Sequence, residues 1–256
     1  MTSLDARFSV VGKRALVTGA SKGIGFAICE TLAAAGADVV AAGRDQTGLN
    51  SVRQKIEAHG RKCLTVTGEL DKAEDCVRIA NEALDAFGTI DIVVNNAAAA
   101  LIDPLLELSV EHWDTTMNVN VRAPFLITRT LAPKMIVQNS GKIINISSQT
   151  GVVALADHAA YAASKAALNM LTQTMTVEWS KYNIQANAIG PTVIMTDMGQ
   201  KVWSPKEMSE PMLAKIPLGR FGEPQEIADL ALFLASGASD LITGQVICAD
   251  GGYTAL

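Results

Sequence analysis

The feature that most constrains the fold is an alternation, along the whole chain, of short β-branched runs with longer helical patterns. Such alternation is typical of repeated β-α-β units, whose parallel strands are covered by helices on both faces of the sheet. We therefore predict an α/β fold in one doubly wound domain, residues 1–256, with a seven-stranded parallel sheet. The predicted strands are 14–18, 38–42, 62–67, 91–95, 142–147, 184–189 and 245–249, and the predicted helices lie near 24–35, 45–58, 72–87, 111–138, 160–182 and 224–236.

The stretch from Pro191 to about Pro224 interrupts this alternation with methionines, a tryptophan, prolines and charged residues. A long connection inside a compact domain is usually functional, and lids over active sites are the common functional case. We interpret residues 191–224 as a substrate lid.

Charge and composition narrow the class of protein. The net charge is -5, and Lys and Arg form no cluster of the kind that binds nucleic acid or an anionic membrane. The four cysteines form no CxxC pair and have no histidine cluster beside them, so we expect neither a metal site nor disulfides. No segment reaches the roughly 18 apolar residues of a membrane span, and the first residues lack the apolar core of a signal peptide. We expect a soluble cytoplasmic protein.

A glycine-rich loop, TGASKGIG at residues 18–25, comes directly between the first predicted strand and the first predicted helix. Small residues let the backbone approach a pyrophosphate, and the free N–H groups of a helix N-terminus attract its charge. Alone, such a loop can also be a tight strand-to-helix turn. In this order of strand, loop and helix it predicts a Rossmann-type dinucleotide site.

The residues after the second predicted strand bear on the choice between NAD(H) and NADP(H). A carboxylate at this point binds the 2′-hydroxyl of NAD, whereas an arginine accommodates the 2′-phosphate of NADP. The predicted strand ends at residue 42, the first position past it, Gly43, carries no acid, and Arg44 comes next. Lys22 adds a second cation in the glycine loop. We therefore expect NADP(H) to be preferred over NAD(H). The alternative is that Arg44 is only solvated and that Asp45 merely caps the next helix.

The pattern Tyr161-Ala-Ala-Ser164-Lys165 opens a predicted helix, and Ser148 ends a predicted strand thirteen positions before Tyr161. Residues four apart share a helix face, so the phenol and the ammonium group can reach the same cleft. A nearby ammonium group favours the phenolate form of a tyrosine. Tyr161 can then transfer a proton while Ser148 donates a hydrogen bond to the substrate oxygen.

With these motifs the chain resembles the short-chain dehydrogenase/reductase family, in its form of about 250 residues. The resemblance covers essentially the whole chain. It rests on TGASKGIG (18–25), NNAA (95–98), NVNVRAPF (118–125), INISS (144–148), YAASK (161–165) and ADGGY (249–253), in the family's order.

The resemblance implies the residues of the active site. It places the family's asparagine on Asn120, which would hold a water linking Lys165 to solvent; Asn118 is set aside because residues two apart do not share a helix face. The expected catalytic residues are Asn120, Ser148, Tyr161 and Lys165. The expected cofactor-binding residues are Gly19, Ser21, Lys22, Gly23, Ile24, Gly25, Arg44, Leu70, Asn96, Tyr161, Lys165, Pro191, Ile194 and Thr196.

Within the family, the chain is most similar to the group of L-xylulose and dicarbonyl reductases. That group shares two departures from the usual family pattern, Ala98 and Thr192, each in place of glycine. A third departure, Glu69 in place of the usual aspartate, leaves the fit of adenine open. The expected substrate residues are Ser148, Gln149, His158, Tyr161 and Trp203.

We expect an NADP(H)-dependent enzyme that interconverts a carbonyl and a secondary alcohol, most often by reducing a small ketose or α-dicarbonyl. Alternatives within the family are a 3-oxoacyl-thioester reductase and a sugar or polyol dehydrogenase. A cofactor-sensing binding protein is the non-enzyme alternative, since fold alone does not fix function. The resemblance also implies a homotetramer, built partly by the long helices near 111–138 and 160–182.

Overall fold

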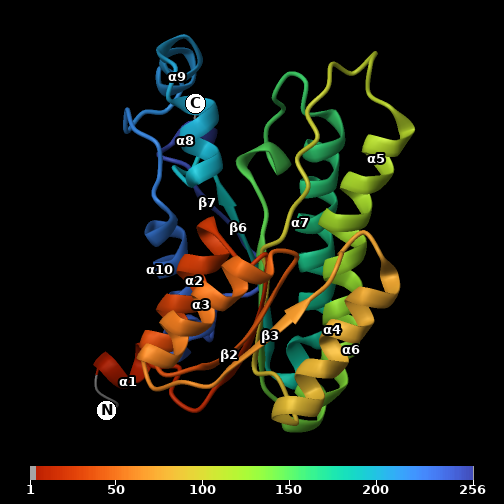
Figure 1. Cartoon of the computed structure of the whole chain (residues 1–256), viewed down its shortest axis with the longest axis vertical. Coiled ribbons are helices and arrows are strands. Elements are labelled where there is room, and N and C mark those ends of the chain that lie inside the picture. Colours follow the sequence, from red (N-terminus) through yellow and green to blue (C-terminus); the bar gives the residue numbers. More distant parts are fainter. Residues whose placement is uncertain (1–3, 256) are drawn as a thin grey trace.

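The computed structural model describes residues 4–255, and its centre is a seven-stranded parallel sheet (Figure 1). The strand order is β3-β2-β1-β4-β5-β6-β7, which confirms the predicted doubly wound α/β fold. The predicted strand ends differ from the observed ones by no more than two residues. The strands are β1 (Arg14–Thr18), β2 (Asp38–Gly43), β3 (Cys63–Thr67), β4 (Ile92–Asn95), β5 (Gly141–Ile146), β6 (Ile184–Pro191) and β7 (Val246–Ala249).

Helices cover both faces of the sheet. Figure 1 shows α2, α3 and α10 on one side and α4, α6 and α7 on the other. Along β1, Val17 packs in the core under the first set and Leu16 in the core under the second, because neighbouring side chains of a strand point to opposite faces. The helices are α1 (Leu4–Phe8), α2 (Gly23–Ala34), α3 (Gln46–Ala58), α4 (Ala73–Phe87), α5 (Val110–Met117), α6 (Ala123–Gln138), α7 (Ala159–Trp179), α8 (Asp197–Trp203), α9 (Lys206–Leu213) and α10 (Pro224–Ala235).

The strand order reverses between β1 and β4. The chain runs outward from β1 to β2 and β3, then returns to the other side of β1 with β4. In open α/β sheets, ligands bind beyond the carboxyl ends of the strands at this point. The glycine loop after β1 and the residues after β4 both lie there.

The prediction of one uninterrupted helix near 111–138 is wrong in one respect. A π-helical turn, Asn118–Arg122, separates α5 from α6. Pro124 has no N–H to donate to the carbonyl of Asn120, four residues earlier. The chain widens instead, and the N–H of Ala123 donates to the carbonyl of Asn118. This turn carries Asn120, one of the expected catalytic residues.

Residues 191–224 are more regular than the predicted loop, because they contain α8 and α9. The side chain of Thr196 caps α8 by accepting a 3.1 Å hydrogen bond from the N–H of Gly199. The two ends of the segment meet where the N–H of Met195 donates to the carbonyl of Gly222 over 2.8 Å. The segment therefore leaves β6 and leads into α10 at one place.

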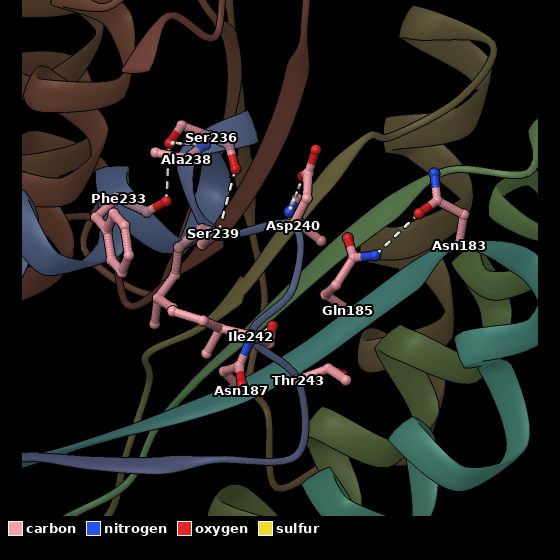
Figure 2. Close-up of polar contacts among 12 residues, drawn as sticks. Asn183, Gln185, Asn187, Phe233, Ser236, Ala238, Ser239, Asp240, Ile242 and Thr243 are labelled. Carbon is pink, nitrogen blue, oxygen red and sulfur yellow. Dashed lines mark hydrogen bonds and ion pairs between the residues drawn. The ribbon is translucent and has the colours of Figure 1, made fainter. Parts of the chain in front are cut away.

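The connection from α10 to β7 is held by side-chain hydrogen bonds at the opposite end of the sheet (Figure 2). The hydroxyl of Ser239 donates to the carbonyl of Ser236 over 3.1 Å, and the amide of Asn187 in β6 donates to the carbonyl of Ile242 over 2.8 Å. These contacts set β7 beside β6, so that the N–H of Thr192 donates to the carbonyl of Ala249. Among residues 4–255, no helix is long and apolar enough to cross a bilayer.

Candidate functional site

The glycine loop has a backbone that only glycine adopts easily. Gly19 has φ +65° and Gly23 has φ +58°, both in the left-handed region. A Cβ added at Gly25 would collide with the carbonyl oxygen of Gly19 and with the side-chain amide of Asn96. The loop therefore packs tightly against the N-terminal turn of α2. This helix begins at Gly23, and no side chain caps its N-terminus. Free N–H groups at a helix N-terminus suit an anionic ligand.

Asn96 braces the glycine loop from β4. Its side-chain amide donates to the carbonyl of Thr18 over 2.9 Å and to that of Gly19 over 3.2 Å. The hydroxyl of Thr18 in turn accepts hydrogen bonds from the N–H groups of Asn96 and Ala97, at 3.0 Å and 3.1 Å. Asn96 is one of the expected cofactor-binding residues, whereas Thr18 is not among them. In the structure both residues shape the loop.

Two exposed cations lie at this edge of the sheet, one in the residues that follow β2 and one in the glycine loop itself. Arg44 and Lys22 are exposed, and within residues 4–255 neither forms an ion pair. The carboxylate of Asp45 accepts a 3.0 Å hydrogen bond from the N–H of Thr47 and caps α3, as the alternative reading proposed. Asp45 is thus turned toward its own helix, and Arg44 and Lys22 are available for an anion. Leu70, partly buried after β3, packs against the core between the sheet and α4.

The residues from 161 to 165 begin α7, and Ser148 follows β5. Ser148 is buried and lies within hydrogen-bonding reach of the phenol of Tyr161. Burial raises the pKa of Tyr161, whereas the hydrogen bond with Ser148 lowers it. The structure therefore brings together the two side chains that the sequence placed thirteen positions apart.

Lys165 is one of the largest fully buried side chains, with 1% of its surface exposed. Its ammonium nitrogen donates a 2.8 Å hydrogen bond to the carbonyl of Ile146 and lies 5.5 Å from the centre of the Tyr161 ring. Burial lowers the pKa of Lys165 to about 7. A buried lysine with no carboxylate beside it is expensive to keep in a core, which marks it as a candidate functional group.

Asn120 joins this group from the π-helical turn. Its side-chain amide donates to the hydroxyl of Ser164 over 2.9 Å and to the carbonyl of Ala99 over 2.9 Å, and its oxygen accepts from the N–H of Ala99. Ser164 donates a 2.7 Å hydrogen bond to the carbonyl of Tyr161. Asn120 is therefore fixed beside the first turn of α7, whereas Asn118 is only partly buried. Ser164, which is not among the expected site residues, links Asn120 to the carbonyl of Tyr161.

Two of the expected substrate residues lie around this cluster. Gln149 directly follows Ser148, is 3% exposed, and its side-chain oxygen is buried without a hydrogen-bond partner among the described residues. The ring of His158 meets the Tyr161 ring edge-on at 6.3 Å, and its Nδ1 contacts the carbonyl of Ala156 at 2.6 Å. Because a carbonyl only accepts, Nδ1 carries the proton and Nε2 is free to bind a ligand.

The residues expected on the lid lie beyond the end of β6. Ile194 is buried and pairs with Gly222, and a Cβ added at Gly23 would touch the methyl group of Thr196. This places Thr196 against the glycine loop. Trp203 on α8 packs against Phe221, with ring centres 5.7 Å apart, and no ring contact in residues 4–255 joins it to Tyr161. Pro191 is buried at the last position of β6.

A cavity of about 540 Å³ lies between this segment and the end of β7. Its walls include Thr192, Ile194, Leu218, Phe221, Cys248 and Gly251. Across residues 4–255, no group of three His, Cys, Asp or Glu side chains is arranged to hold a metal ion.

This arrangement fits a dinucleotide cofactor. Because Gly25 has no Cβ, α2 packs closely against the loop after β1. The uncapped start of α2 offers its free N–H groups to a pyrophosphate. Ser148 follows β5, and Tyr161 and Lys165 lie in the first turns of α7, so these side chains come from elements at the carboxyl ends of the strands as well.

Comparisons with known proteins agree with this geometry. Residues 19–254 match the family model described as enoyl-(acyl carrier protein) reductase. The chain is 41% identical to the NAD-dependent glycerol dehydrogenase of Listeria innocua, over 98% of this chain and 97% of that one. It is 41% identical to the L-xylulose reductase of Mesocricetus auratus, over 95% and 97%.

Solved structures of dehydrogenases and reductases also superpose on this chain over nearly its whole length. A gluconate 5-dehydrogenase from Burkholderia cenocepacia, in complex with NADP and tartrate, superposes with a TM-score of 0.93 at 33% identity, covering 99% of this chain and 100% of that one. The chain belongs to the short-chain dehydrogenase/reductase family, and is thus an oxidoreductase of a family that uses a nicotinamide cofactor and acts on small molecules.

Proposed function

We propose that the chain is an NADP(H)-dependent reductase of small ketoses or α-dicarbonyls. The observation that carries the substrate class is the side-chain oxygen of Gln149, the residue after Ser148. This oxygen is buried and has no hydrogen-bond partner among residues 4–255. An orphaned buried acceptor is costly, and a substrate hydroxyl would satisfy it. His158 offers a second polar atom next to Tyr161.

In this proposal, the residues of the chain hold the carbonyl and move the proton. When bound, the nicotinamide supplies the hydride that reduces the carbonyl carbon. Ser148 donates a hydrogen bond to the carbonyl oxygen, and Tyr161 gives that oxygen its proton. Lys165 sets the charge state of Tyr161 and offers a route for its reprotonation. Asn120 and Ser164 hold the turn of α7 that carries Tyr161 in position.

The preference for NADP(H) rests on Arg44 and Lys22, which are exposed near the glycine loop without a competing carboxylate. The second candidate function is a polyol dehydrogenase that works with NAD, and the similarity to a glycerol dehydrogenase supports it. In that reading Tyr161 removes the proton from an alcohol. The same four side chains serve both directions, because a proton-transfer residue works reversibly.

We also propose a homotetramer. On α6 and α7, Phe125, Met170 and Val177 are exposed by 40%, 61% and 84%. Exposed apolar side chains on adjacent long helices are suited to packing across a two-fold axis. Light scattering on the purified protein should give four times the mass of the chain.

A turnover panel tests the function. Purified protein is assayed with NADPH and NADH against L-xylulose, diacetyl and a long 3-oxoacyl thioester, and with NADP⁺ and NAD⁺ against glycerol. The proposal expects the highest kcat/KM with NADPH and L-xylulose or diacetyl. Faster turnover of glycerol with NAD⁺ would favour the polyol dehydrogenase. Faster turnover of the thioester would favour a 3-oxoacyl-thioester reductase. Tight NADPH binding without any turnover would favour a binding protein.

A further inference from the structure

The hydroxyl of Ser148 is contacted twice by one neighbouring residue. The N–H of Thr150 donates to the Ser148 oxygen over 3.2 Å, and the Thr150 hydroxyl donates to the same oxygen over 2.8 Å. Both residues are buried, with 8% and 6% of their surface exposed. Among residues 4–255, the Thr150 hydroxyl makes no other hydrogen bond.

These two contacts decide where the proton of Ser148 points. A hydroxyl group has one proton to donate and two lone pairs that accept. Thr150 occupies both lone pairs, so Ser148 can take part in a further hydrogen bond only as the donor. That donor can serve the phenol of Tyr161, because a hydrogen bond with Ser148 lowers the pKa of Tyr161.

Thr150 is itself held firmly. It lies in a 3₁₀ turn, Gln149–Gly151, that follows Ser148. Gly151 packs against the backbone of α7, where an added Cβ would lie 2.9 Å from the carbonyl carbon of Lys165. The amide of Asn169 also donates to the carbonyl of Gly151 over 3.2 Å. The turn is thus fixed to the same helix that carries Tyr161.

We propose that Thr150 is a positioning residue that commits the Ser148 hydroxyl to donate toward the Tyr161 oxygen and, in the complex, toward the substrate oxygen. This rests on the proposed function, in which Ser148 and Tyr161 touch the reacting oxygen. A donor aimed at the phenol stabilises the phenolate, and a donor aimed at the substrate stabilises the oxyanion. Without the Thr150 hydroxyl, Ser148 gains an acceptor position and can turn away.

The test compares Thr150→Val, which removes the hydroxyl at nearly constant volume, with Thr150→Ser, which keeps it. Alcohol oxidation requires the phenolate, so kcat/KM rises with pH through the pKa of Tyr161. In T150V we expect this rise to move to higher pH by about one unit, so that kcat/KM is about tenfold lower at pH values below the rise. T150S should follow the unmodified protein, and the KM for the cofactor should stay the same in both variants.

The comparison isolates the hydroxyl because the other titratable groups facing Tyr161 are unchanged. These are Lys165 on α7 and His158 just before it. Thr174→Val, which removes an exposed hydroxyl from the same helix, is the matched control. An unshifted pH profile in folded T150V would overturn the proposal, as would T150S being as impaired as T150V. If T150V does not fold, Thr150→Ala removes the same hydroxyl and takes its place.

A second measurement does not depend on the substrate. Ultraviolet absorbance follows the ionisation of tyrosines, and subtracting the titration of Tyr161→Phe isolates Tyr161. Its titration should lie at higher pH in T150V than in the unmodified protein and in T150S. Coincident titrations would overturn the role of Thr150, whereas a shift without turnover of any alcohol tested would leave that role standing and count against the proposed substrates.

Discussion

The ammonium nitrogen of Lys165 lies 5.5 Å from the centre of the Tyr161 ring and donates its hydrogen bond to the carbonyl of Ile146. A nearby ammonium group favours the phenolate form of a tyrosine, as long as the lysine carries its charge. Burial, however, lowers the pKa of Lys165 to about 7. Without cofactor, its charge therefore changes close to neutral pH, and so does its influence on Tyr161.

This leads to a prediction about stability without cofactor. In the unfolded chain the pKa of Lys165 is the ordinary 10.5, and in the folded chain it is about 7. Between these values the unfolded chain holds a proton that the folded chain lacks, so this group makes the free energy of unfolding rise with pH. Below pH 7 the full cost of burying the charge remains. The free energy of unfolding of the unmodified protein, minus that of Lys165→Met, should therefore increase from pH 7 to about pH 10.

Urea unfolding at several pH values measures this difference. Lys181→Met, on an exposed lysine after α7, is the control and should run parallel to the unmodified protein. Parallel curves for Lys165→Met and the unmodified protein would mean that the lysine is hydrated in solution and keeps its ordinary pKa.

Tyr161→Phe should keep cofactor binding and lose nearly all turnover. The ring that packs near Lys165 and His158 remains, while the transferable proton is removed. Proton transfer by a positioned side chain contributes about 10²–10⁴-fold, so kcat should fall by at least about a hundredfold. Fluorescence titration with NADPH checks the binding. A folded variant with near-normal kcat would refute the role given to Tyr161.

Much of the fold could be predicted because its signals are local. The alternation of β-branched runs and helical patterns gives all seven strands, and the glycines of residues 18–25 give the loop after β1. That Tyr161 and Lys165 share one helix face follows from helix periodicity alone. Each of these depends on neighbours within about one helix turn or one strand.

The rest depends on residues that meet only in the folded chain. The pKa of Lys165 follows from burial under β5, which no spacing rule contains. The hydrogen bonds by which Asn96 holds the glycine loop join it to Thr18 and Gly19, which lie 78 and 77 positions earlier in the sequence. The helices α8 and α9 do not follow from the sequence pattern, because the prolines and charged residues of 191–224 are typical of a loop. Pro211 in fact lies inside α9.

Gly25→Ala should abolish cofactor binding with modest loss of stability. The added methyl group meets the carbonyl of Gly19 and the amide of Asn96, which are backbone and braced side chain rather than flexible ends. The loop must then open and lose its fit to a pyrophosphate. Gly237→Ala is the matched control, because its Cβ would lie 3.7 Å from its nearest neighbours. Calorimetric binding of NADPH should be lost in the first variant and kept in the second.

Arg44→Asp should reduce or invert the preference for NADPH over NADH. The cation near the 2′-phosphate is replaced by an anion that repels it and can bind a 2′-hydroxyl. The ratio of kcat/KM for the two cofactors is the measurement, and about a tenfold change or more is expected, corresponding to 1.4 kcal/mol. Arg7→Asp, an exposed arginine on α1, should leave the ratio unchanged. A preference for NADH in the unmodified protein would refute the NADP(H) proposal itself.

His158→Ala should raise the KM for a ketose more than the KM for diacetyl. Because Nδ1 of His158 is bound to the carbonyl of Ala156, Nε2 is the atom left to accept a substrate hydroxyl. A ketose has hydroxyl groups that lose this partner, whereas diacetyl has none. One lost hydrogen bond costs about 0.5–1.5 kcal/mol, which corresponds to roughly a two- to tenfold rise in KM for L-xylulose. His59→Ala, an exposed histidine at the end of α3, is the control and should change neither value. Equal rises for both substrates would show that His158 acts on Tyr161 or on the loop rather than on the hydroxyls of the substrate.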